Sequence, residues 1–144
     1  MPNSFSVKVD FQATIRALTI EASKIEKAGF YSLGQVALAV EREAKLNAVE
    51  GGTHKRGTLT PAQPGGGPAR ITGALQRSIH TEVRQGFGSY EATVGPSMVY
   101  ARQVELGGGR WKSGVKYPYM IPAGQKVKER ANEIFTQAMA RKLR

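Results

Sequence analysis

Histidine and acidic side chains are the groups from which a catalytic or metal site in this sequence would have to be built. His54 lies in a glycine-rich stretch and His80 on a predicted strand, and neither has acids nearby at the spacing of a metal site. The candidate acids are Glu41, Glu43, Glu105 and Glu129. Each is explained as an ordinary charge on a helix surface, so a pair of carboxylates for acid and base catalysis cannot be argued. We expect no metal site, no cofactor and no catalytic residue.

Two short motifs match known patterns only in part. Residues 52–57 have the glycine spacing of a phosphate-binding loop, but Thr58 follows where a Lys-Ser/Thr pair is required, and the preceding segment has a helical pattern. Ser113 and Lys116 have the Ser-x-x-Lys spacing of some acyl-transfer enzymes, without the companion motifs. The first match fails on both counts and chance explains the second, so we expect that the protein is not an enzyme.

The composition predicts one soluble domain over residues 1–144. This length fits a single domain, and the 40% apolar content is enough for one modest core. The chain has no cysteine, which excludes disulfides, thiolate zinc sites and cysteine nucleophiles. It shows neither a leader-like N-terminal pattern nor the roughly 20 consecutive apolar residues that a membrane span needs. We therefore expect a cytoplasmic protein without a membrane partner.

The net charge of +10 is concentrated in two regions. Residues 51–84 hold five basic groups against one acid, and residues 110–144 hold nine basic groups against two acids. Such a distribution favours a nearby phosphate or an acidic protein surface. A solvated basic surface without a dedicated partner is the simpler alternative. In the first region, Lys55, Arg56 and Arg70 are the candidates to face a partner or a nucleic acid.

Apolar residues recur at helical spacing over residues 10–49, the predicted helical region. The first stripe is Phe11, Ile15, Leu18, Ala22 and Ile25. The second stripe is Leu33, Val36, Ala37, Val40 and Ala44. Asp10 is placed to cap the first helix, and the glycine pair at residues 51–52 should end the second near Val49. Gly29 separates the two stripes, and the pattern leaves open whether it breaks or bends the path.

A long basic loop is predicted over residues 51–70, GGTHKRGTLTPAQPGGGPAR, because glycine and proline are frequent there and no apolar period is present. A stretch of this length without regular structure is uncommon inside a compact domain and is usually functional or disordered. We expect it to be mobile in the free protein and to become ordered on assembly.

A β-rich region is predicted over residues 71–121, and an antiparallel hairpin forms its first part. The alternating apolar positions are Ile79, Thr81 and Val83 on one strand and Tyr90, Ala92 and Val94 on the other. Residues 86–89 have the composition of the connecting turn. The pattern of residues 98–106 fits a short helix and a strand equally well.

A C-terminal amphipathic helix is predicted over residues 122–143, beginning near Pro122 or Ala123. Its apolar face is Val127, Ala131, Ile134, Phe135, Ala138 and Met139. Helices followed by a small antiparallel sheet and a further helix define an α+β fold.

Three segments resemble, in this order, those of a family of phage proteins. They are residues 70–79 (RITGALQRSI), residues 94–107 (VGPSMVYARQVELG) and residues 117–123 (YPYMIPA). The chain resembles the neck and tail-completion proteins of tailed bacteriophages, also described as head-tail joining or minor tail components, across residues 10–142. The run at 117–120 departs from the Arg-Pro-Phe-Leu-like run that is usual in the family, which leaves its packing role intact but puts a family-specific contact in doubt.

The segments also have a direct physical interpretation. Gly73 should supply a turn that leads into the first hairpin strand, with Leu75 and Ile79 in the core. Prolines in residues 117–123 should keep the backbone extended and carry an apolar strip to the last helix. Glu105 would pair with an arginine within or between subunits, or be an ordinary surface acid.

The resemblance implies a structural subunit of the virion neck or upper tail, assembled in the host cytoplasm. The partners implied are further copies of the chain in a sixfold ring, head-closure or connector proteins, and tail terminator or tail tube proteins. Genomic double-stranded DNA would pass through the ring and meet it by non-specific phosphate contact. Candidate intersubunit contacts are Tyr100, Arg102, Glu105, Trp111, Tyr117 and Tyr119. A small basic nucleic-acid-binding protein is the alternative; its charge fits, but no recognised fold signature supports it.

Overall fold

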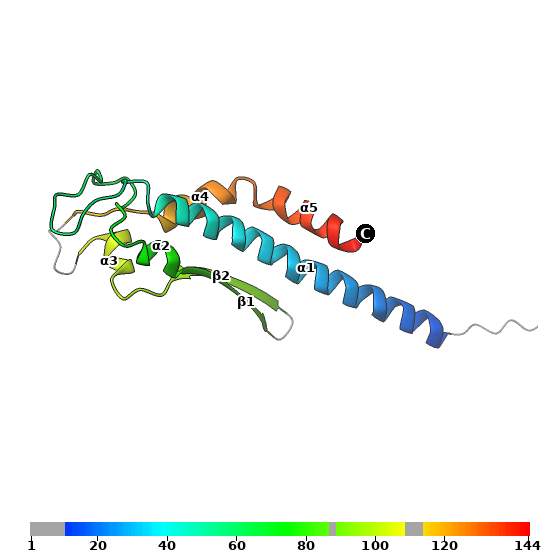
Figure 1. Cartoon of the computed structure of the whole chain (residues 1–144). Coiled ribbons are helices and arrows are strands. Elements are labelled where there is room, and N and C mark those ends of the chain that lie inside the picture. Colours follow the sequence, from blue (N-terminus) through cyan, green and yellow to red (C-terminus); the bar gives the residue numbers. More distant parts are fainter. Residues whose placement is uncertain (1–10, 87–88, 109–113) are drawn as a thin grey trace, which may run out of the picture.

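The computed structural model describes residues 11–86, 89–108 and 114–144, which form an α+β fold (Figure 1). In chain order the elements are α1 (Phe11–Asn47), α2 (Ala74–Ser78), β1 (Ile79–Gly86), β2 (Ser89–Pro96), α3 (Ala101–Leu106), α4 (Met120–Lys128) and α5 (Ala131–Leu143). The predicted cap at Asp10, the tip of the hairpin turn and the candidate contact Trp111 lie outside the described residues.

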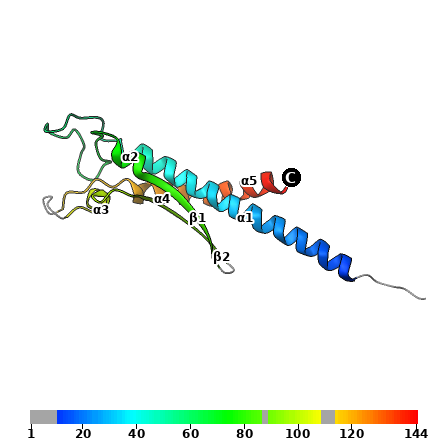
Figure 2. The ribbon, with the colours of Figure 1, turned by 60° about the horizontal axis from the view of Figure 1, so that its bottom comes forward.

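The long helix α1 forms the axis around which the other elements are placed. Helices α4 and α5 contact one side of it, and the hairpin contacts another (Figure 1). In both views the first part of α1 extends beyond these elements (Figure 2). The C-terminal helices α4 and α5 therefore pack on the second part of the first described helix, and its first part is left uncovered by them.

Helix α1 continues through Gly29 without a break. A glycine in a helix interior costs about 1 kcal/mol relative to alanine, so packing nearby must offset it. Ala28 and Ser32 supply that packing, since both are fully buried, and Ser32 Oγ donates a hydrogen bond to the Ala28 carbonyl at 2.7 Å. The helix ends at Asn47, slightly before the expected Val49.

The hairpin confirms the predicted alternation. β1 and β2 pair antiparallel from Ile79 opposite Pro96 to Gly86 opposite Ser89. Ile79 is buried and Thr81 and Val83 are partly buried, while the residues between them are exposed. Thr81 Oγ1 donates to Glu41 Oε2 at 2.6 Å, which ties the hairpin to α1.

The region 71–121 contains two short helices in addition to the hairpin. Gly73 supplies the expected turn with a φ of 77°, but it leads into α2 and not directly into the first strand. The ambiguous residues 98–106 form α3 in their second half. These helices are only five and six residues long, which is too short for apolar periodicity to reveal.

The prediction of a single C-terminal helix over residues 122–143 is wrong. Two helices are present, α4 and α5, with a break at residues 129–130. The apolar period passes across this break because both helices pack on α1, so periodicity alone could not show it. The extended backbone predicted for residues 117–123 is also wrong from Met120 onward, because Pro122 lies in the first turn of α4, where its missing N–H is not needed.

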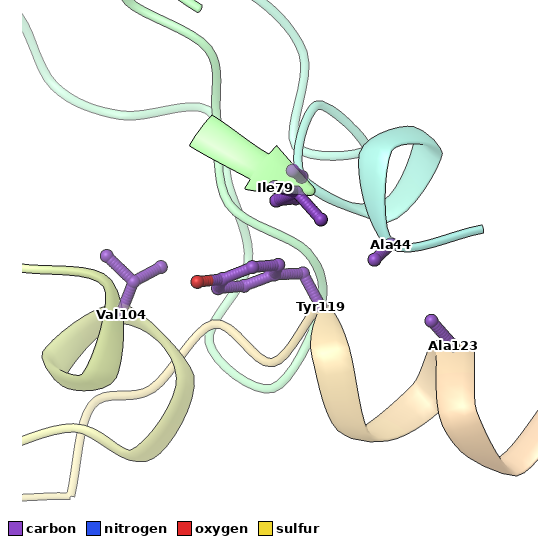
Figure 3. Packing of buried hydrophobic residues seen from close by; sticks show 6 residues of the cluster. Ala44, Ile79, Val104, Tyr119 and Ala123 are labelled. Atoms are coloured by element: carbon purple, nitrogen blue, oxygen red, sulfur yellow. The ribbon is translucent and has the colours of Figure 1, made fainter. Parts of the chain in front are cut away.

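A small core joins α1, β1, α3 and the start of α4. Its buried members are Ala44, Ala48, Ile79, Val104, Tyr119 and Ala123. The Tyr119 ring points toward Val104 with Ile79 beside it, and small alanine side chains on α1 and α4 leave room for the ring (Figure 3). Ile79 is fully buried and Leu75 packs against the same cluster, so both predicted core residues are confirmed.

Candidate functional site

Glu105 at the end of α3 holds the beginning of α4. Its carboxylate accepts hydrogen bonds from the backbone N–H groups of Tyr119 at 2.7 Å, Met120 at 2.9 Å and Ile121 at 2.8 Å. The first N–H groups of a helix have no partner within the helix, and a negative charge there is stabilised by the helix dipole. Tyr119, the residue before α4, provides no side-chain cap of its own. A carboxylate distant in sequence therefore does the work of an N-cap.

This arrangement corrects the expectation for two candidate contact residues. Glu105 and Tyr119 are 8% and 1% exposed, so both are used inside the subunit and neither presents a surface to a neighbour. Burial raises the pKa of the Tyr119 hydroxyl, which accordingly stays protonated. Glu105 is neither a surface acid nor the partner of an arginine among the described residues.

Two further acids on α1 also have structural roles. Glu43 is 8% exposed and accepts from Lys126 Nζ at 2.7 Å and Arg130 Nη2 at 3.2 Å, which joins α1 to α4 and to the break before α5. The hydrogen bond from Lys126, helped by nearby positive charge, lowers the pKa of Glu43 below its usual value. Burial raises the pKa of Glu41, but hydrogen bonds from Lys45 and Thr81 outweigh it and lower the pKa overall. The expectation that Glu43 is an ordinary surface charge is therefore wrong.

The stretch 51–70 contains no helix or strand, but it is fixed at both ends. Thr53 and Arg70 form a parallel β-bridge, with hydrogen bonds from His54 N to Arg70 O at 2.9 Å and from Arg70 N to Gly52 O at 2.6 Å. Gly65 N also donates to Lys116 O at 2.9 Å. Ala62 is buried, so the stretch has packing within the subunit that its glycine and proline content did not predict.

A cavity of about 650 Å³ lies between this stretch, α2 and α3. Its apolar wall includes Ile71, Leu75, Val104 and Val115. Four of the residues singled out from the sequence also line it, namely Arg56, Arg70, Tyr100 and Tyr117. The volume falls within the 300–1,000 Å³ range of pockets that take small ligands or side chains.

The remaining sequence candidates lie elsewhere. Lys55 and Arg102 are exposed and do not line the cavity. His80 is exposed, with Nδ1 at 2.9 Å from the Ser78 carbonyl, whereas His54 lines the cavity. Over residues 11–86, 89–108 and 114–144 no group of three or more His, Cys, Asp or Glu side chains could hold a metal ion.

The first part of α1 is a second candidate surface, which we call the exposed arm (residues 15–27). Ile15, Leu18 and Ile25 are 54%, 66% and 54% exposed. In the second half of α1 the same face is covered by the rest of the subunit, since Ala37 and Ala44 are buried. One continuous apolar face is thus covered along part of its length and uncovered along the rest.

The chain matches no family model, no curated protein and no solved structure. Within its described part, no helix is both long enough and apolar enough to cross a membrane.

Sequence reasoning missed the cavity and the role of Glu105. The signal for Glu105 was available: α4 begins without a Ser, Thr, Asp or Asn cap, so its first N–H groups needed an acceptor from elsewhere. No comparable signal marked the cavity, because its walls come from four separate segments.

Proposed function

We propose that this chain is a non-enzymatic structural subunit of the neck or upper tail of a tailed bacteriophage, where copies of it form a ring between the head connector and the tail. The resemblance of residues 70–79, 94–107 and 117–123 to neck and tail-completion proteins gives the setting. The exposed arm of α1 is the observation that carries the proposal of assembly.

The arm exposes an apolar stripe that has no cover within the described subunit. Burying one aliphatic side chain of this size contributes about 1.5–3 kcal/mol, and the arm leaves several such side chains uncovered. A neighbouring chain that covers Ile15, Leu18 and Ile25 would stabilise both the stripe and the helix. In a cyclic ring every subunit has such a neighbour.

The hairpin adds a second assembly surface. The described sheet has two strands, so each strand has one edge without a partner strand. Such edges are covered in many assemblies by a neighbouring chain. A sixfold ring that uses the arm and the hairpin would leave basic residues available to head-closure proteins, to tail terminator or tube proteins, or to DNA in the channel.

The second candidate is a small basic nucleic-acid-binding protein, and the basic surface of the C-terminal helices favours it. Lys128 and Arg141 are exposed and pair with no acid among the described residues. Salt-dependent binding of the isolated monomer to double-stranded DNA, with loss of affinity as salt rises, would support this candidate.

Deletion of the gene tests the phage proposal directly. Electron microscopy of the resulting lysate should show DNA-filled heads separate from tails, or defective tails, while replication and packaging continue. When the gene is supplied again, the resulting particles should contain the protein as a ring in the neck or upper tail. Infectious particles of normal appearance after deletion, or a single copy per virion, would overturn the proposal.

A further inference from the structure

We propose that the cavity between residues 51–70, α2 and α3 binds an apolar group that carries a carboxylate, with Arg56 and Arg70 holding the anion. The site does not depend on ring assembly, so either proposal can fail without the other. A free alkyl carboxylate and the carboxyl end of an apolar protein segment share this chemistry.

The positive charge at the cavity has no carboxylate to balance it. Arg56 and Arg70 line the cavity, no acidic residue does, and neither arginine forms an ion pair within the described part of the chain. Arg77 lies close by, because Arg70 Nε and Arg77 Nη1 both approach within 3.0 Å of the point where a Cβ on Gly73 would stand. Two neighbouring guanidinium groups repel each other, and an anion between or beside them relieves that repulsion.

The interior of the cavity suits an apolar body. Three polar residues of its wall already have hydrogen bonds within the subunit: Thr60 Oγ1 accepts from Ala62 N, Thr72 Oγ1 accepts from Ala74 N, and Gln76 Nε2 donates to Lys45 O. A ligand body rich in polar groups would therefore find few partners and would lose hydration on entry. An alkyl chain or aliphatic side chains would meet Ile71, Leu75 and Val104 instead.

One polar atom of the wall is still unsatisfied. His54 Nδ1 is buried and has no hydrogen-bond partner among the described residues. Buried polar side-chain atoms in folded proteins nearly always have a partner, which makes each exception a place to look for a ligand. An ionised carboxylate can only accept a hydrogen bond, so the tautomer with its proton on Nδ1 would donate to the ligand head once the buried imidazole edge turns toward the cavity.

Glycine at position 73 leaves room for the guanidinium groups of Arg70 and Arg77. Its φ of 77° lies in the left-handed region that other residues rarely adopt, and a Cβ there would contact both arginine side chains. The turn that leads into α2 therefore also leaves the space in which the Arg70 and Arg77 side chains approach each other.

Calorimetric titration of the full chain with two pairs of probes tests the proposal. Octanoate is compared with octanamide, and N-acetyl-Leu-Leu with a free carboxylate is compared with its C-terminal amide. We expect one saturable site that binds at least one acid about tenfold or more tightly than its neutral twin, as charge-assisted hydrogen bonds from arginine require. Binding of octanoate alone assigns a free alkyl ligand, and binding of the peptide acid alone assigns a protein chain end.

The double variant Arg56→Gln/Arg70→Gln should remove this preference for the acid. Lys55→Gln is the control, because it removes one positive charge from the same stretch at a residue that does not line the cavity, and it is compared with each single arginine variant as well as with the double variant. Perturbed amide signals of residues 70–76 in nuclear magnetic resonance spectra should locate the bound probe. Equal affinity for acids and neutral twins, binding unchanged in the double variant, or no saturable binding of any probe would overturn the proposal.

Discussion

Glu105 Oε2 lies 2.7 Å from the backbone nitrogen of Tyr119, and the same carboxylate accepts from the next two N–H groups of the chain. The end of α3 and the start of α4 are therefore fixed by one side chain. Because the Tyr119 side chain is itself part of the core, this carboxylate also places the largest fully buried side chain of the described subunit.

Replacing Glu105 should destabilise the fold more than replacing an exposed acid. Glu105→Gln keeps one acceptor but turns an amide toward N–H donors, and Glu105→Ala leaves three N–H groups without their acceptor. We expect a loss of about 1–3 kcal/mol in the free energy of unfolding for Gln and more for Ala, measured by urea denaturation. Glu91→Gln, on the exposed side of β2, is the control and should stay within about 0.5 kcal/mol of wild type.

The ion pairs of Glu43 should make the free energy of unfolding depend on pH in the acidic range. The pKa of Glu43 is lowered from 4.5 in the folded chain, so its contribution is present above 4.5 and is lost as pH falls through the lower folded value. In Glu43→Gln, the free energy of unfolding should therefore fall less than in wild type as the pH is lowered from neutral through the range in which Glu43 titrates. Lys126→Gln should reduce this pH dependence in part, because Arg130 still pairs with Glu43. Lys128→Gln removes the same charge from α4 without contacting Glu43, and should leave the pH dependence as in wild type. A pH dependence of stability in Glu43→Gln that equals that of wild type would contradict this role of Glu43.

Gly67 should be intolerant of a side chain, although its neighbour Gly66 should accept one. A Cβ on Gly67 would collide with the Asn47 carbonyl and with the Glu50 side chain, whereas on Gly66 the nearest atom lies at 3.4 Å. We expect Gly67→Ala to lower the free energy of unfolding by about 1–3 kcal/mol and to expose residues 51–70 to limited proteolysis. Gly66→Ala, measured in parallel, should resemble wild type, and equal effects of the two would argue against the close packing of this stretch.

The exposed arm should matter for assembly and little for the monomer. Ile15→Gln and Ile25→Gln change exposed residues, so monomer stability should move by less than about 0.5 kcal/mol. In a complementation assay with a deletion phage, the double variant should lower the yield of infectious particles at least tenfold. Ile20→Gln is the matched control, since Ile20 is similarly exposed but lies on another face of α1. If Ile20→Gln has the same effect, the stripe is not the contact surface.

The sequence predicted those helices and strands in which buried and exposed side chains recur at a regular spacing. The hairpin is an example, because Ile79, Thr81 and Val83 alternate with exposed residues and one face meets α1. The stripe over Ile15 to Ile25 was also recognised as helical. Its exposure could not be predicted, since the same period describes a face covered by its own chain and a face that is uncovered.

Features that depend on contacts between distant residues were not predictable in the same way. The break between α4 and α5 falls where Arg130 reaches Glu43 on α1, a contact across most of the chain. Arg56 and Arg70 were predicted to face a partner or a nucleic acid, and Tyr100 and Tyr117 to form intersubunit contacts; the fold brings all four to one cavity. Glu105 and Tyr119 were also predicted as intersubunit contacts, but both are buried inside the subunit, because residue type alone does not tell which side chains face the core.

The packing of α4 and α5 on α1 has a consequence for synthesis on the ribosome. Helix α1 emerges before the helices that cover its apolar face, which are translated only after the hairpin and α3. Throughout that interval the face that bears Val40 and Ala44 is open to water and to other nascent chains. Exposed apolar surface of this kind invites aggregation and chaperone binding. A ribosome stalled before residue 120 should therefore carry an α1 that recruits chaperones more strongly than the same chain released in full length.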